Sequence, residues 1–229
     1  MARPNKLLQR TAKVGLWLGL SFIAITTVLV LTLRWVNPPS SMVIQQWQRE
    51  SDRKAVQTWQ PLSRISPNLQ MAVIAAEDQK FSHHHGFDFS SLQKALNENR
   101  KRIRGASTIT QQTAKNLFLW NGRSYVRKGL EAWFTLLMEL LWPKERILEA
   151  YLNIAEFGEG IYGAEAAARN HFGVPAQSLN RWQSGLLAAV LPNPRRMSAR
   201  YPSEYVRGRA HAINRQVNQL GGTGYLKAM

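Results

Sequence analysis

The pattern of apolar and polar positions divides the chain into two parts. Residues 14–33 contain no charged side chain, and about 20 apolar residues are what a helix needs to cross the hydrocarbon core of a bilayer. Beyond them, apolar residues recur at helical spacing in segments separated by proline and glycine, with no convincing strand alternation. The pattern therefore predicts a mostly α-helical domain preceded by a single transmembrane helix.

The flanks of the apolar stretch favour a retained membrane anchor over a cleaved signal peptide. Residues 1–13 hold several basic residues and no acid. A signal peptide has a shorter apolar core and a small-residue cleavage site, whereas Arg34, Trp35 and the pair Pro38-Pro39 follow here. A buried helix of a globular protein explains the basic flank less well. Because positively charged flanks stay in the cytoplasm, we expect the rest of the chain to lie across the membrane.

Breaks in the pattern divide the chain further. We expect a basic cytoplasmic tail over 1–13, an anchor over 14–33, a juxtamembrane segment over 34–60 and a globular domain over 61–229. A helix over 42–60 should end at Pro61, and Ser66 and Pro67 should start the next one as N-cap and first helical residue. Further helices are expected over 90–102, within 104–116, and over 127–142, 144–153, 164–172, 182–191 and 203–220.

Composition narrows the classes of partner. The formal net charge is +16 and the chain has no cysteine. This charge favours an anionic partner, either a nucleic acid, an acidic membrane surface or a phosphorylated substrate. A disulfide framework and a cysteine-based zinc site are both excluded.

The first stretch with candidate chemistry follows an apolar run. Residues 71–76 are apolar, and Glu77 and Asp78 come directly after them. A carboxylate carried from a buried helix end into a cleft is partly desolvated, which raises its pKa and makes it a better base. A solvated helix terminus with a turn at Gly86 explains the same pattern equally well.

A second stretch favours an anion or sugar site, and a third pairs a cation with an acid. Gln111, Gln112, Lys115 and Asn116 recur at helical spacing, so one helix face carries amides and a cation. Lys128 and Glu131 are spaced i,i+3 on the next helix. The alternatives are an amphipathic helix with a capped start and an ordinary helical salt bridge, which contributes little to stability.

Together these stretches resemble the motifs of glycosyltransferase family 51, the peptidoglycan glycosyltransferases. The first motif matches Glu77, Asp78, Phe81, His84, Gly86 and Asp88, and the second matches Gly105, Ser107, Thr108, Thr110, Gln111, Gln112, Lys115 and Asn116. The third matches Arg127, Lys128 and Glu131, the fourth lies within 144–153, and a glycine-rich fifth ends at Gly173. His171 stands where many members have tyrosine. Residues 174–229 leave no room for a transpeptidase domain, so the monofunctional, single-anchor branch is the closer resemblance.

The resemblance implies a lysozyme-like helical fold and an inverting transfer reaction. Its substrates would be lipid II and the growing glycan strand, joined by a β-1,4 bond as polyprenyl pyrophosphate leaves. Glu77 matches the general base and Glu131 the second essential carboxylate of the family. Lys115, Arg127 and Lys128 would hold the pyrophosphate. Contacts to sugar and phosphate are implied for Ser107, Thr108, Gln111, Gln112 and Asn116, and a structural role for Asp78, Phe81, His84, Gly86 and Asp88.

The resemblance also bears on a metal ion, on the location and on the partners. Glu131 would either orient the cations or hold Mg²⁺ or Mn²⁺ on the pyrophosphate, because such ions need few protein ligands on a phosphate. Three consecutive histidines, 83–85, do not converge on one ion without strain. The implied location is the bacterial inner membrane with the catalytic domain in the periplasm. The lipid bilayer and other cell-wall synthesis proteins are the expected partners, and this placement disfavours nucleic acid.

Two other classes compete with this interpretation. A glycan hydrolase would also use two carboxylates, but a neutral glycan needs no group of cations such as Lys115, Arg127 and Lys128 to bind it. A non-catalytic basic membrane scaffold explains the anchor and the charge but not the glutamates. Cleavage of purified cell wall, as opposed to extension of lipid II, separates the hydrolase from the transferase.

Overall fold

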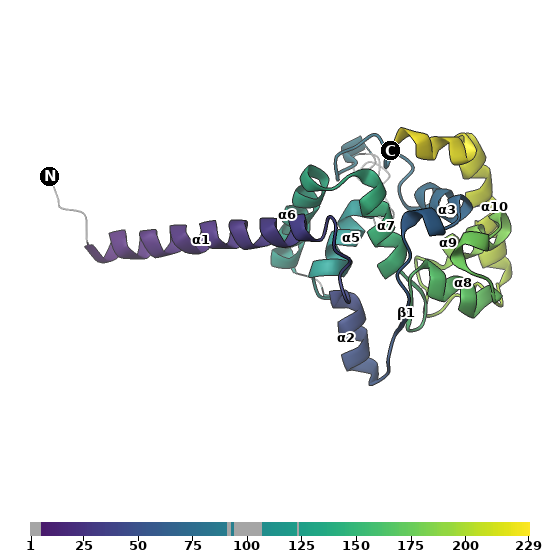
Figure 1. Ribbon diagram of the computed structural model, residues 1–229, viewed down its shortest axis with the longest axis horizontal. Coiled ribbons are helices and arrows are strands. Elements are labelled where there is room, and N and C mark those ends of the chain that lie inside the picture. The colour runs from purple at the N-terminus through teal and green to yellow at the C-terminus, as the bar shows by residue number, and fades with distance from the viewer. Residues whose placement is uncertain (1–5, 91–92, 94–106, 123) are drawn as a thin grey trace. The chain divides into compact units, whose positions relative to one another are not determined.

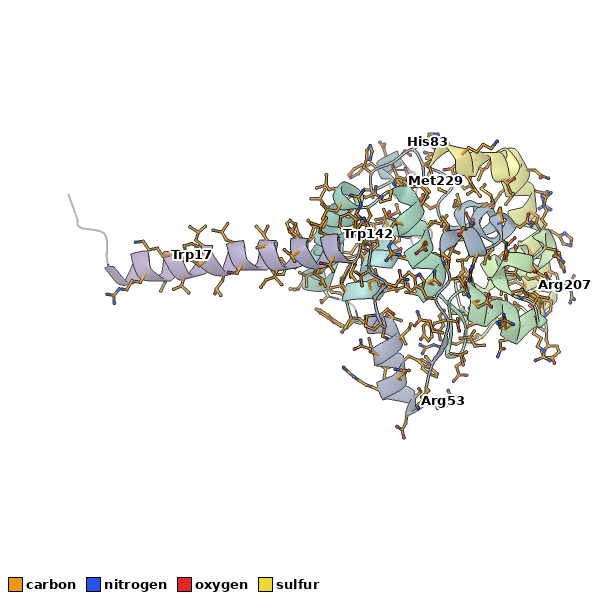
Figure 2. All side chains as sticks on the ribbon, viewed as in Figure 1. Trp17, Arg53, His83, Trp142, Arg207 and Met229 are labelled. Carbon is orange, nitrogen blue, oxygen red and sulfur yellow. The ribbon has the colours of Figure 1, made fainter. Side chains whose placement is uncertain are left out.

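The computed structural model describes residues 6–90, 93, 107–122 and 124–229, which form two units, Met1–Pro38 and Pro39–Met229 (Figure 1). The first unit consists mainly of α1 (Lys6–Thr32). Within α1, Lys13–Thr32 is long and apolar enough to cross a membrane, and it is the one such helix among the described residues. Trp17, labelled in Figure 2, lies on this helix and is largely exposed.

The second unit is mostly helical, as predicted. Its α-helices are α2 (Met42–Ser51), α3 (Pro67–Glu77), α5 (Ile109–Phe118), α6 (Tyr125–Leu141), α7 (Lys144–Ile154), α8 (Ala164–Phe172), α9 (Arg181–Val190) and α10 (Glu204–Gln219). Short 3-10 helices are η1 (Leu62–Arg64), η2 (Ala176–Ser178) and η3 (Gly222–Ala228). The helix predicted over 90–102 lies almost entirely outside the described residues.

The helix predicted over 42–60 is wrong in its second half. Helix α2 ends at Ser51, because Asp52 adopts a left-handed conformation with φ of 52°. Residues 56–57 then form β1 (Val56–Gln57), which pairs in parallel with β3 (Ile161–Tyr162). The strand β2 (Glu156–Gly158) pairs antiparallel with β3 and completes a sheet of order β1-β3-β2.

The core is built around two helices that are apolar on most faces. Helix α3 is buried from Leu69 to Ala75, and α9 from Ser184 to Val190. The two helices pack against each other, and α10 packs against both. A helix with apolar residues all round is stable only when surrounded by protein. The predicted start of α3 is confirmed, since Ser66 accepts a hydrogen bond from Asn68 N and Pro67 is the first helical residue.

A second helical layer places the polar motifs. Helix α5 packs against α6 and α7. The end of α3, one face of α5 and the first turns of α6 carry most of the residues singled out by the sequence.

Candidate active site

Glu77 is the last residue of α3, and its carboxylate lies beside α5. Its Oε2 accepts a hydrogen bond from Gln112 Nε2 at 2.9 Å. Burial raises the pKa of Glu77, although the Gln112 hydrogen bond and the positive charge of Arg209 lower it, and the charge of Asp78 raises it further. A glutamate with a raised pKa accepts a proton more readily than an ordinary one.

Tyr151 of α7 completes this hydrogen-bond chain. Its hydroxyl donates to Gln112 Oε1 at 3.3 Å. Burial, together with the charges of Glu77 and Asp78, raises the pKa of Tyr151 well above its ordinary value, so the hydroxyl stays protonated. The chain Tyr151–Gln112–Glu77 therefore fixes the Gln112 amide with its NH₂ group toward the carboxylate.

The turn after Glu77 is tied to the start of α5. His84 Nε2 lies 2.8 Å and 3.0 Å from the two carboxylate oxygens of Asp78, and Ile109 N donates to Asp78 Oδ2 at 3.0 Å. Phe81 is fully buried beneath the turn. These contacts connect the end of α3 to α5, which carries Gln112.

Gly86 occupies a position that requires glycine. Its φ is +82°, and an added Cβ would lie 2.7 Å from Thr135 Cγ2. Its carbonyl accepts a hydrogen bond from Thr108 Oγ1 at 2.7 Å. Asp88, further along, accepts from Ser90 Oγ at 2.6 Å. The 78–88 segment thus fits closely between α5 and α6.

The polar residues at the start of α5 serve two separate purposes. Thr108 and Gln111 are buried and form a reciprocal capping box, with Thr108 N donating to Gln111 Oε1 at 3.0 Å and Gln111 N donating to Thr108 Oγ1 at 3.2 Å. Ser107 is exposed just before the cap, and Gly105 lies outside the described residues. Of the predicted sugar- and phosphate-contacting residues of α5, Gln112, Lys115 and Asn116 line a cleft beside the helix. Thr108 and Gln111 do not line it.

The cleft has a volume of about 180 Å³. Its lining residues are Val43, Gln112, Lys115, Asn116, Asn121, Tyr151, Ala155, Glu156, Leu191 and Pro194. The polar members are three amides, an ammonium group, a carboxylate and a phenol, which suit the hydroxyls of a sugar and an anionic group.

Glu156 and Asn121 were not expected from the sequence. Glu156 lies on β2, where Arg195 Nε donates to its two oxygens at 3.0 Å and 3.1 Å. A strand of three residues is too short to show alternation, so nothing in the pattern pointed to Glu156. Asn121 lies just after α5, in a connection without a recognisable motif.

A cluster of cations surrounds one buried carboxylate at the start of α6. Glu131 is 4% exposed. Its Oε2 accepts from Arg127 Nη1 at 2.8 Å, and its Oε1 accepts from Lys128 Nζ. Burial lowers the pKa of Lys115. The negative charge of Glu131 raises this pKa, and the positive charges of Arg127 and Lys128 lower it further. Two cations contact this carboxylate and the charge of a third, Lys115, interacts with it, so the group is positive overall and favours an anion.

The donor set does not suit a metal held by protein side chains. Both oxygens of Glu131 already accept hydrogen bonds from cations. Within the described part of the chain, no group of three histidine, cysteine, aspartate or glutamate side chains is placed to hold a metal ion. His84 bonds Asp78, whereas His83 Nδ1 lies 2.9 Å from Ser82 Oγ.

Comparison with known proteins assigns the family. Residues 41–218 match the model of the transglycosylase family. Similar curated proteins named biosynthetic peptidoglycan transglycosylase come from Pseudomonas fluorescens, with 54% identity over 97% of this chain and 94% of the relative, and from Stutzerimonas stutzeri, with 53% identity over 97% and 93%. The protein of that name from Ectopseudomonas mendocina is 53% identical over 98% of this chain and 94% of the relative. The chain therefore belongs to the transglycosylase family.

Proposed function

We propose that this transglycosylase polymerises lipid II into the β-1,4-linked glycan strands of peptidoglycan. The family and the names of its relatives support a peptidoglycan glycosyltransferase. One structural observation supports the specific reaction most. Gln112, which bonds Glu77, and Lys115, which lies in the Glu131 cluster, are one helical turn apart on α5 and line the same cleft.

This arrangement suits a reaction with two different demands. A hydroxyl that attacks a sugar carbon must lose its proton, and a departing pyrophosphate must have its negative charge stabilised. Residues three positions apart on a helix are separated by about 4.5 Å along its axis. Gln112, which is bonded to the base, and Lys115, which interacts with the cation cluster, therefore lie on adjacent turns of α5.

In the proposed step, the 4-hydroxyl of the lipid II GlcNAc attacks C1 of the terminal MurNAc of the growing strand. Glu77 accepts the hydroxyl proton as the new C–O bond forms. The bond between C1 and the pyrophosphate oxygen breaks, and both of its electrons leave with the lipid pyrophosphate. Attack from the opposite face inverts the anomeric centre.

The cation cluster binds the leaving group. Lys115, Arg127 and Lys128 would contact the pyrophosphate through charge-assisted hydrogen bonds. Glu131 holds Arg127 and Lys128 in place, which favours an orienting role for this carboxylate. Mg²⁺ or Mn²⁺ on the pyrophosphate stays a prediction, and such an ion would depend on phosphate oxygens and water rather than on Glu131.

The membrane location is part of the proposal. The apolar span of α1 supports anchoring in a membrane. Basic residues before this span support a cytoplasmic N-terminus, and with that orientation the catalytic unit would lie on the periplasmic side of the bacterial inner membrane. There it would meet lipid II in the bilayer, and other cell-wall synthesis proteins.

Incubation of the purified protein with fluorescent lipid II tests the proposal. We expect long products that a muramidase degrades, and no solubilisation of purified cell wall. A protein that leaves lipid II unchanged but solubilises purified wall would instead be a hydrolase.

A further inference from the structure

The C-terminal segment contacts the turn that follows Glu77. After α10, Gly221 and Gly222 adopt positive φ values of 89° and 65°, and η3 then packs against α3 and α10. Figure 2 labels His83 of the turn and Met229 at the same end of the unit. The family match ends at residue 218, so η3 lies beyond it.

One hydroxyl forms the centre of this contact. Tyr225 Oη accepts a hydrogen bond from Ser82 N at 3.0 Å and donates one to Gln79 O at 3.2 Å. The Tyr225 ring also lies 6.1 Å from the His83 ring, centroid to centroid. The hydroxyl therefore bridges the carbonyl and the amide of residues three apart, where a β-turn often has a direct hydrogen bond.

The bridged turn starts two residues after Glu77. Its inner side is fixed by buried Phe81 and by the Asp78–His84 pair. Its outer side, at Gln79 and His83, is exposed. On that outer side Tyr225 supplies two main-chain hydrogen bonds.

We propose that Tyr225 is a positioning residue for Glu77. By closing the 79–82 turn from the outside, it holds the last turn of α3 in the orientation that directs the Glu77 carboxylate toward Gln112 and the attacking hydroxyl. This inference rests on the proposed role of Glu77 as the base. The C-terminal segment thus belongs to the catalytic unit functionally as well as by contact.

The substitution Tyr225→Phe tests the proposal, because it keeps the ring and removes both hydrogen bonds. Small misplacements of a reacting group have large effects on rate, so we expect kcat for lipid II polymerisation to fall about tenfold with KM unchanged. Hydrogen exchange of the 78–85 peptide should accelerate. The matched control is Tyr205→Phe, at an exposed tyrosine of α10. It should change neither kcat nor the hydrogen exchange of the 78–85 peptide.

The outcomes separate this inference from the proposed function. If the wild-type protein polymerises lipid II and Tyr225→Phe matches it in kcat, the positioning role is wrong while the proposed function stands. A fall in kcat explained by a lower folded fraction, with exchange accelerated throughout the unit, would also overturn the positioning role. If the wild-type protein does not polymerise lipid II, the proposed function fails, and with it the catalytic reason for positioning Glu77.

Discussion

At the scale of single residues, neighbouring side chains of α5 have opposite roles. Gln111 is buried and caps the helix, whereas Gln112, the next residue, reaches Glu77 and the cleft. Sequence spacing identifies the helix, but which amide faces the cleft depends on how α5 packs against α6 and α7. Arg209, whose charge acts on Glu77, was missed for the same reason, since α10 is far from the motifs in sequence.

Lys115 should matter for the donor substrate. Loss of hydrogen bonds to a charged group costs about 1.5–3 kcal/mol, so Lys115→Ala should lower turnover about 10- to 100-fold and weaken binding of a donor-site phosphoglycolipid inhibitor. Lys54→Ala, at an exposed lysine, is the control and should behave as wild type. Normal polymerisation by Lys115→Ala would remove this residue from the pyrophosphate site.

The raised pKa of Glu77 predicts a dependence of stability on pH. A folded-state pKa above the ordinary 4.5 means that the folded protein binds the proton more tightly than the unfolded chain. Ionisation of Glu77 therefore destabilises the fold progressively as pH rises through and above 4.5.

Thermal unfolding of Glu77→Gln checks this prediction. At pH 7.5 the variant should melt at a higher temperature than wild type, and this difference should shrink as pH falls toward 4.5. The difference in melting temperature between variant and wild type should therefore be larger at pH 7.5 than at low pH. The opposite trend would contradict burial as the main cause of the raised Glu77 pKa.

At the scale of elements, the helices whose ends are marked by proline, glycine or capping residues were predictable, and the short strands were not. Helices α3 and α7–α10 begin and end within a few residues of the expected positions, because proline, glycine and capping residues mark their ends. The sheet and the early end of α2 were missed. The sheet depends on pairing of residues 56–57 with 161–162, a contact between segments far apart in sequence that local patterns do not report. The end of α2 depends on the left-handed conformation of Asp52, which the sequence does not mark with a glycine.

Gly86 tests how tightly the 78–88 segment fits between the helices. Gly86→Ala should destabilise the protein by roughly 2–4 kcal/mol, because it adds positive-φ strain to overpacking against Thr135. Gly208→Ala is the matched control, since a Cβ there meets no atom within 4 Å and alanine favours a helix. Chemical denaturation should show a large loss for the first and none for the second; equal stabilities would contradict the described turn.

At the scale of the whole molecule, the two units differ in their charged residues, because the first unit has basic residues but no acidic ones. All of the sequence's acidic residues lie beyond residue 38, while the flank before the apolar span is purely basic. The existence of the apolar helix was evident from the sequence. The orientation of this helix across a membrane depends on how its flanking basic residues interact with the membrane, and the fold does not determine it.

A reporter fused after Met229 tests this orientation. We expect a periplasm-dependent reporter to be active and a cytoplasm-dependent one to be silent, since the basic flank should stay in the cytoplasm. Replacing Arg10 and Lys13 by glutamine should weaken this preference. An active cytoplasmic reporter would place the cleft on the side opposite to the one the proposed reaction requires.

The central claim is that Glu77 is the base of a lipid II polymerase, and the initial polymerisation rate of Glu77→Gln tests it most directly. Glutamine keeps the shape of the side chain but does not accept the proton, and a general base contributes roughly 10²–10⁴-fold in rate. We predict a loss of about that size, with donor-site inhibitor binding unchanged because the Glu131 cluster is intact. A folded Glu77→Gln protein that polymerises lipid II at the wild-type rate would contradict the account.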